Sequence, residues 1–250
     1  MTEKNSMLTI SARNLSRDFG AYTAVREIDL ELKRGEVLGF LGPNGAGKTT
    51  TMRMLTGNLA PSSGSVEICS IDLLDKPREA KTHIGYLPET PPLYRELTVN
   101  EYLRLAAKLH RVSSIKIYSA LDEVKLHCGL KDAGKYLIGS LSKGYQQRVG
   151  IAQAIIHDPD VVILDEPTVG LDPNQMREIL SLIRELGTKH SVILSTHILS
   201  EVESVCDRVQ IMHQGQMVFN DTLSGLKQKR INLEEMFAQL TLNNETSETL

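Results

Sequence analysis

The nine residues GPNGAGKTT, from Gly42 to Thr50, limit what this chain can be more than any other stretch of its sequence. Gly42 and Gly47 are separated by four residues. Lys48 and Thr49 follow at once, which completes the pattern of a phosphate-binding loop. In such a loop the glycines let backbone N–H groups close around a β-phosphate. The lysine reaches the β- and γ-phosphates, and the threonine hydroxyl binds Mg²⁺.

The residues on either side of this loop suit a nucleotide site. VLGFL (37–41) is a short apolar run typical of a buried strand, and TTTMRMLTG (49–57) suits a helix that Gly57 ends. A strand before the loop and a helix after it form the context that phosphate binding requires. We therefore prefer a ligand-binding loop to a glycine-rich turn that binds nothing.

The stretch VVILDEP (161–167) supplies the second half of a nucleotide site. Asp165 ends a β-branched, apolar run of the buried-strand type and can hold Mg²⁺. Glu166 is placed to orient and deprotonate an attacking water. Two adjacent carboxylates that merely capped a turn would repel each other, so a nearby cation is the better explanation. The two motifs together predict a P-loop NTPase.

The composition is that of an ordinary globular protein. The chain has 250 residues, of which 41% are hydrophobic and 24% charged, and its formal net charge is −3. No basic stripe or aromatic-rich surface stands out, so we expect no nucleic-acid partner. Cys69, Cys128 and Cys206 fit neither a disulfide framework nor a metal-binding spacing, and we expect reduced thiols.

The sequence has no feature of a membrane-spanning or secreted protein. No apolar run approaches the roughly 18 residues that would suggest a spanning helix. Residues 1–10 lack the apolar stretch of a secretory signal. We therefore expect a cytoplasmic chain.

Strand and helix patterns predict three parts. Alternating strands and helices place a nucleotide-binding core at 1–87 and 158–220. The segment 88–157 begins with a proline-rich loop and then has helical spacing, so we interpret it as a helical insertion. The tail, 221–250, contains the helical stretch NLEEMFAQL (232–240) and ends in polar residues that we expect to be disordered.

Several helix ends can be predicted from capping residues. Thr98 and Glu101 have the spacing of a capping box at the start of a helix in the insertion. Asp172 is the predicted N-cap of a helix over 173–186, and VQIM and MVF near the C-terminus suit a hairpin. In LSKGYQQRV (141–149), Ser142 suits an N-cap. A free helix N-terminus attracts anions, so this stretch predicts a second anion site.

The motifs together resemble those of ATP-binding cassette (ABC) proteins. LSKGYQQR (141–148) resembles the family's signature motif, and GLDP (170–173) resembles its D-loop. His197 in LSTH looks like the switch histidine, and Phe19 falls where the family places an aromatic that stacks on adenine. The order and spacing match over nearly the whole chain. The resemblance implies a single α/β domain over 1–250, with a RecA-like P-loop NTPase core, an antiparallel β subdomain and a helical insertion subdomain.

The resemblance also implies roles for the site residues. Lys48, Glu166 and His197 would take part in ATP hydrolysis, and Thr49, Asp165 and Glu89 would hold Mg²⁺. The residues in contact with nucleotide would be Phe19, Asn44, Gly45, Ala46, Gly47, Lys48, Thr49 and Thr50. In this family two cassettes pair head to tail around two ATP molecules. Ser142 and Gly144 would therefore grip the γ-phosphate bound by a second cassette, and a homodimer is the simplest pairing.

The sequence departs from the family pattern at three places. Lys143 and Tyr145 stand where the signature commonly has glycine and glutamine. Val169 replaces the small polar residue that usually begins the D-loop, which weakens the expectation of hydrogen bonds across the dimer. Glu89 stands where the family usually has glutamine. Its side chain either reaches Mg²⁺ or is turned to solvent by the prolines around it, and the sequence leaves both possibilities open.

The leading functional prediction is the ATPase subunit of a membrane transporter. The cassette would dock on a separate transmembrane permease through Leu93, Tyr94 and Leu97, on the inner face of the cell membrane. IGYLPETPPLY (84–94) and LEEMF (233–237) look most like cassettes of ABC-2-type exporters. The alternative is a soluble cassette ATPase of translation or DNA repair, but those usually carry two cassettes or a long coiled-coil insertion. The transported substrate does not follow from the sequence.

Overall fold

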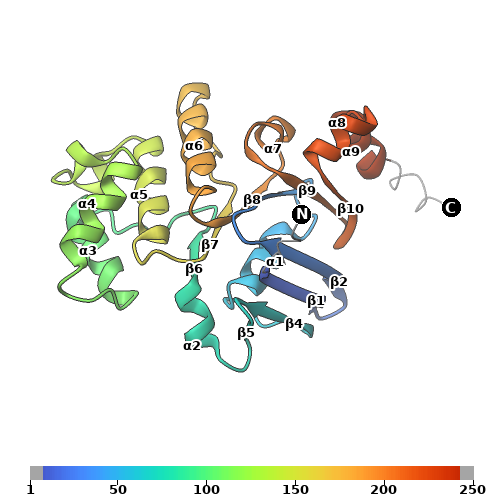
Figure 1. Cartoon of the computed structure of the whole chain (residues 1–250), viewed down its shortest axis with the longest axis horizontal. Coiled ribbons are helices and arrows are strands. Elements are labelled where there is room, and N and C mark those ends of the chain that lie inside the picture. Colours follow the sequence, from blue (N-terminus) through green and yellow to red (C-terminus); the bar gives the residue numbers. More distant parts are fainter. Residues whose placement is uncertain (1–7, 243–250) are drawn as a thin grey trace, which may run out of the picture.

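The computed structural model describes residues 8–242, which form two sheets with helices around them (Figure 1). The larger sheet has six strands in the order β10-β9-β3-β8-β7-β6. Its strands are β3 (Val37–Leu41), β6 (Ile84–Leu87), β7 (Val161–Asp165), β8 (Ser191–Thr196), β9 (Arg208–His213) and β10 (Gln216–Thr222). Neighbours are parallel except β9 and β10, which form the hairpin predicted near the C-terminus.

The central strands are buried along their whole length, and each has an apolar middle. Every residue of β3, β7 and β8 is buried, as parallel strands covered on both faces require. The register places Leu41 opposite Thr196 and Asp165 opposite Ser195. The carboxyl ends of these strands therefore meet at one edge of the sheet, where the connecting loops lie close together.

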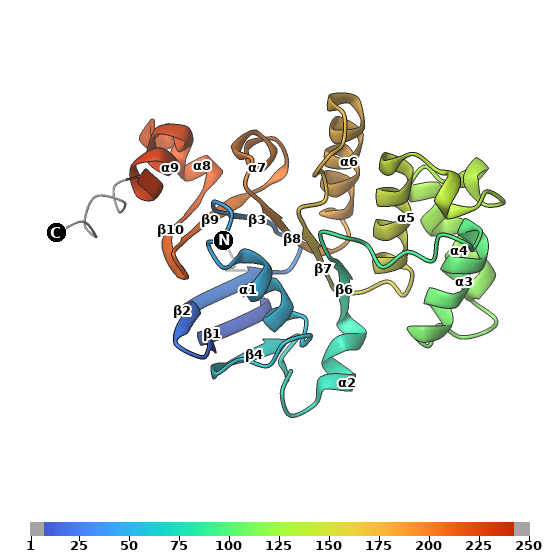
Figure 2. The same cartoon turned by 180° about the vertical axis from the view of Figure 1, so that it is seen from behind.

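The smaller sheet is antiparallel, with the order β2-β1-β4-β5. Its strands are β1 (Leu8–Phe19), β2 (Tyr22–Lys33), β4 (Ser63–Ile68) and β5 (Ile71–Asp72). Helix α1 (Lys48–Leu55) lies against this sheet (Figure 2). Its residues Met52, Met54 and Leu55 share one buried apolar cluster with β1, β2 and β3. Burial in this shared core fixes the start of α1 at the end of β3.

The helical insertion lies beyond β6, at the opposite end of the larger sheet from β10 (Figure 1). Its helices are α3 (Val99–Leu109), α4 (Ile117–His127) and α5 (Lys143–Ile155), preceded in the chain by the short α2 (Pro77–Ala80). The capping box of Thr98 and Glu101 is confirmed at the start of α3. Ser142 is confirmed as the N-cap of α5.

The remaining helices are α6 (Pro173–Leu186), α7 (Leu199–Val205), α8 (Leu223–Lys229) and α9 (Leu233–Leu242). Asp172 caps α6 as predicted. Helix α9 was predicted, whereas α8, which Thr222 caps, was not. The expected disorder of the tail concerns residues outside those described, and the division at 88, 158 and 221 stays a prediction.

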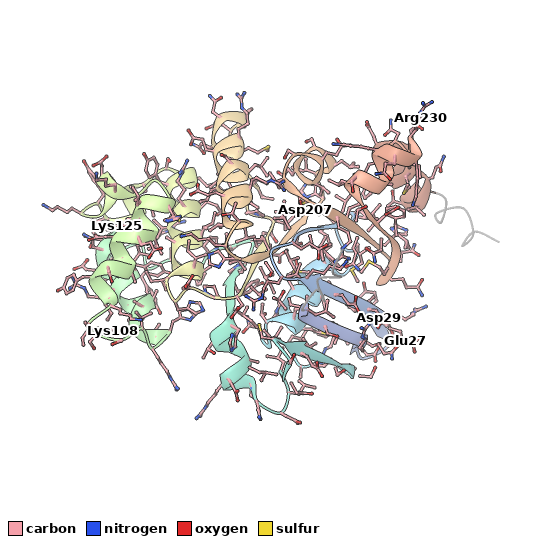
Figure 3. All side chains as sticks on the ribbon, viewed as in Figure 1. Glu27, Asp29, Lys108, Lys125, Asp207 and Arg230 are labelled. Carbon is pink, nitrogen blue, oxygen red and sulfur yellow. The ribbon has the colours of Figure 1, made fainter. Side chains whose placement is uncertain are left out.

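Charged side chains are spread over the parts of the fold that the structure describes. Acidic Glu27 and Asp29 lie on the smaller sheet, and basic Lys108 and Lys125 lie on the helical insertion (Figure 3). Within residues 8–242, no helix has both the length and the apolar character needed to cross a bilayer.

Candidate nucleotide site

The loop between β3 and α1 needs glycine at two positions. Gly47, the N-cap of α1, has φ +104°, a conformation that disfavours residues with a Cβ. A Cβ on Gly47 would lie 2.5 Å from Ala24 O, and one on Gly42 would lie 2.3 Å from Met212 O. The glycines therefore let the loop pack closely against neighbouring backbone. The loop ends at the N-terminus of α1, whose unpaired N–H groups favour an anion.

Lys48 is buried and has three oxygen neighbours within the chain. Its Nζ donates to Gly42 O at 2.8 Å and to Pro43 O at 3.2 Å. It also lies 3.3 Å from Glu166 Oε1. These contacts hold the ammonium group between the loop and the end of β7, at the place where the sequence predicted phosphate binding.

Glu166 and His197 meet across the ends of β7 and β8. His197 Nδ1 lies 2.9 Å from Glu166 Oε2. Glu166 is buried and has a left-handed backbone with φ +49°, and its N–H donates to Ser195 O at 2.9 Å. A non-glycine residue in this conformation is costly and is found most often at functional sites. Glu166 thus connects Lys48 on one side with His197 on the other.

Asp165 lies at the end of β7 with no exposed surface. Its Oδ1 accepts a hydrogen bond from Ser195 Oγ at 2.8 Å, and its Oδ2 has no hydrogen-bond partner among residues 8–242. Burial raises the pKa of Asp165, and the charges of Glu166 and Glu89 raise it further. The hydrogen bond from Ser195 acts in the opposite direction. A buried carboxylate oxygen without a partner is a suitable ligand for a cation.

A pocket of about 490 Å³ contains most of the predicted nucleotide residues. Its lining includes Phe19, Asn44, Gly45, Gly47, Lys48, Thr49, Thr50, Glu89, Glu166 and His197. Ala46 and Asp165 are buried and are not part of this lining. The pocket therefore brings together Phe19 at the end of β1 with residues that follow β3, β6, β7 and β8 in the chain.

Ser142 and Gly144 do not line this pocket. Ser142 is exposed at the N-terminus of α5. Gly144 packs against Gln175 of α6, and a Cβ on this glycine would lie 2.7 Å from the Gln175 side chain. The predicted second anion site is therefore separate from the phosphate loop of the same chain.

Sequence reasoning missed Tyr22, Ala24 and Val169 as pocket residues. Tyr22 pairs with Phe19 in the register of the β1–β2 hairpin, and both rings are exposed. The Arg17 guanidinium lies 4.7 Å from the centroid of the Phe19 ring. Tyr22 could have been predicted as a pocket residue, because it is an aromatic residue across the hairpin turn from Phe19. No feature of the sequence indicates that Ala24 lines the pocket.

The site has the geometry of a P-loop NTPase. A glycine-bearing loop follows the buried parallel strand β3, and Lys48 lies between that loop and Glu166. The buried Asp165 ends β7, which is separated from β3 in the sheet by β8 alone. A sequence profile of the family described as ABC transporter matches residues 25–169, more than half of the 250 residues. The chain belongs to the ABC transporter family.

Individual relatives agree with this assignment. YxlF of Bacillus subtilis, an uncharacterized ABC transporter ATP-binding protein, is 39% identical over 221 residues, covering 88% of this chain and 73% of YxlF. The bacitracin transport ATP-binding protein BcrA of Bacillus licheniformis is 39% identical over 222 residues, covering 88% and 72%. A solved structure of the ATP binding subunit of an ABC transporter has a TM-score of 0.83 at 32% identity, covering 93% of this chain and 99% of that one.

The family and the fold class predicted from the sequence are thereby confirmed. The chain is an ATP-binding subunit of an ABC transporter and an ATPase. The alternative of a soluble cassette protein of translation or DNA repair is not favoured, because these relatives are transporter subunits by name.

Proposed function

We propose that this chain drives an ABC-2-type exporter as one of two cassettes on a separate transmembrane permease. The contact of Glu166 with both Lys48 and His197 in the nucleotide pocket carries the proposal. The similarity to BcrA, which is named for bacitracin transport, supports a transporter of this kind. The exporter-like stretches 84–94 and 233–237 support the same conclusion.

Nucleotide binding uses the residues that line the pocket. The backbone N–H groups of 44–50 surround the phosphates, and Lys48 Nζ contacts the β- and γ-phosphates. Phe19 stacks on the adenine. The Arg17 guanidinium against the Phe19 ring supports this role, because it restricts the motion of an exposed aromatic side chain.

The residues around Asp165 fit Mg²⁺, which prefers oxygen ligands. Asp165 Oδ2 is buried without a hydrogen-bond partner among the described residues, and Thr49 stands in the first turn of α1 and lines the nucleotide pocket. Thr49 and Asp165 would hold the ion, with Glu89 as a further ligand from the pocket wall. Bound Mg²⁺ would neutralise charge on the phosphate oxygens.

Hydrolysis uses Glu166 as the general base. Its carboxylate takes a proton from water as the water oxygen bonds to the γ-phosphorus. The bond to the bridging oxygen breaks, and ADP and phosphate leave. Lys48 exchanges its contact with Glu166 Oε1 for the phosphate, which frees that oxygen to accept the proton. His197 keeps the carboxylate oriented through Oε2.

A second cassette completes the site. Ser142 is exposed at the start of α5, a helix of 13 residues, and lies outside the lining of the chain's own pocket. We infer that Ser142 and Gly144 contact ATP bound to a second copy of this chain. Lys143 at the same helix start adds a positive charge toward that phosphate.

The permease docks beside the nucleotide pocket. A second pocket of about 490 Å³ is lined in part by Pro91, Leu93 and Arg95, and Glu89 lines both pockets. Tyr94 is 51% exposed next to it. An apolar, partly exposed loop that follows directly from the nucleotide site suits contact with a permease. The chain would then lie on the inner face of the cell membrane.

Two measurements test the proposal. In ATPase assays, Glu166→Gln should hydrolyse ATP slower by a factor on the order of 10²–10⁴ while still binding it. In fractionated cells of the source organism, the chain should sediment with membranes. Hydrolysis at the wild-type rate by Glu166→Gln would reject Glu166 as the general base. Absence of the chain from the membrane fraction would reject its docking on a permease.

A further inference from the structure

Glu201, in the first turn of α7, is a buried acid whose two carboxylate oxygens are both occupied. Its exposed fraction is 0%. Oε1 accepts a hydrogen bond from Thr168 Oγ1 at 2.5 Å, and Oε2 accepts one from Thr196 Oγ1 at 2.6 Å. Burial raises the pKa of Glu201, and the two threonine hydrogen bonds act against that rise. A buried carboxylate is costly, so its retention calls for a structural or functional reason.

The two threonines belong to the segments that carry the proposed base and its histidine. Thr168 lies two residues after Glu166, in the turn that follows β7. Thr196 is the last residue of β8 and directly precedes His197. The Thr196 hydroxyl oxygen also accepts a hydrogen bond from Ile198 N–H at 3.1 Å. The residues on both sides of His197 are thus joined to each other and, through Thr196, to Glu201.

We propose that Glu201 is a positioning residue for ATP hydrolysis, which holds the turn of Glu166 and the turn of His197 at a fixed separation. The inference rests on the proposed roles of Glu166 and His197. Glu201 does not line the nucleotide pocket, so it acts through the threonines. A carboxylate suits this task because it accepts from two hydroxyl groups at once, whereas a glutamine side chain offers one acceptor oxygen.

The mechanism depends on a small distance. The 2.9 Å contact between His197 Nδ1 and Glu166 Oε2 joins side chains from two different loops. Without the Glu201 carboxylate, the backbone hydrogen bond from Glu166 N–H to Ser195 O still joins the ends of β7 and β8. The turns that follow these strands are then no longer held to the same side chain. A displacement of about 1 Å in a catalytic group costs up to roughly a hundredfold in rate.

The test is steady-state ATP hydrolysis by the full chain carrying Glu201→Gln, Thr168→Val or Thr196→Val. Each change keeps the approximate shape of the side chain and removes part of the hydrogen-bond link. We expect kcat per ATP-binding molecule to fall by about ten- to a hundredfold, with KM for ATP changed by less than about twofold. Glu203→Gln is the matched control, because Glu203 is exposed on the same helix, and it should leave kcat unchanged.

A double variant distinguishes positioning from general stability. If Thr196 acts through Glu201, adding Thr196→Val to Glu201→Gln should cause little further loss of kcat. A lower unfolding temperature with wild-type kcat per ATP-binding molecule would overturn the proposal, as would losses that multiply in the double variant. If Glu201→Gln keeps wild-type kcat and Glu166→Gln loses it, the positioning role of Glu201 is rejected and the proposed function stands. If Glu166→Gln also keeps wild-type kcat, the proposed function is rejected as well.

Discussion

Lys48 Nζ lies 3.3 Å from Glu166 Oε1, so the proposed phosphate ligand and the proposed base neutralise each other in this structure. Both side chains are buried, and solvent screens the contact little. Nucleotide must therefore compete with Glu166 for the lysine. The same exchange that binds the phosphate releases the base, which ties hydrolysis to a correctly bound γ-phosphate.

Replacing the base should trap a dimer. In Glu166→Gln the amide cannot take a proton from water, so bound ATP persists. The two chains then stay together, with the start of α5 in each chain against the nucleotide of the other. Size-exclusion chromatography with ATP and Mg²⁺ should show a dimer that is absent without ATP. Adding Lys48→Ala should restore the monomer, because the phosphates lose their lysine. A strictly monomeric Glu166→Gln at high protein concentration would contradict head-to-tail pairing.

Ser142→Arg should separate binding from hydrolysis. Ser142 is exposed and outside the pocket of its own chain, so ATP binding to the monomer should stay nearly unchanged. Hydrolysis should be lost, because a large side chain would block the second cassette's phosphate. Binding is measured by fluorescent-nucleotide titration, and Ser114→Arg, at another exposed serine, is the control. The assignment is wrong if Ser142→Arg weakens monomer binding as much as Lys48→Ala does.

The parts of this structure that sequence could predict depend on local rules. Thr98, Ser142 and Asp172 were predicted as N-caps because a cap bonds to N–H groups within three residues. The phosphate loop was predicted because its glycines and Lys48 all lie within one short stretch of the sequence. The strands β3 and β7 were recognisable because burial on both faces favours an unbroken apolar run.

The parts that could not be predicted depend on which strands become neighbours. In ILSEVESVCD (198–207), helical spacing places Glu201 on the face of Val202 and Val205, but it does not show what the carboxylate contacts there. Its partner Thr168 is 33 residues away in the chain. The pairing of β7 with β8 brings Ser195 to Asp165 and His197 to Glu166. It also brings Thr168, which follows β7, to Glu201, which follows β8.

His157 should make the fold less stable in acid. Its ring stacks on that of His110, with centroids 3.8 Å apart, and its Nε2 lies 3.1 Å from Ile84 O, which can only accept. Burial, reinforced by His110, lowers the pKa of His157 to about 4. An unfolded histidine titrates near about 6.5, so between these values the unfolded chain binds the extra proton.

The stabilisation linked to His157 is thus complete above about pH 6.5 and is lost as the pH falls toward about 4. Urea unfolding at pH 7 and pH 4.5 measures it. Wild type should lose on the order of 2 kcal/mol more than His157→Gln over this interval. Equal losses in the two proteins would show that protonation of His157 does not oppose folding.

Glu89 should make hydrolysis respond more steeply to free Mg²⁺. It follows β6, lines the nucleotide pocket, and its charge contributes to the raised pKa of Asp165. With Mg²⁺ bound, a carboxylate is a harder and stronger ligand than an amide. Without the ion, Glu89 faces the γ-phosphate as a like charge and weakens ATP binding.

The measurement is ATPase rate against free Mg²⁺ for wild type, Glu89→Gln and Glu96→Gln. Glu96 is exposed a few residues further along the same loop and is absent from the pocket lining, so its change should leave the curve in place. The Mg²⁺ midpoint of Glu89→Gln should rise by about tenfold, equivalent to roughly 1.4 kcal/mol. Superimposable curves for wild type and Glu89→Gln would mean that Glu89 is turned to solvent and has no part in holding the ion.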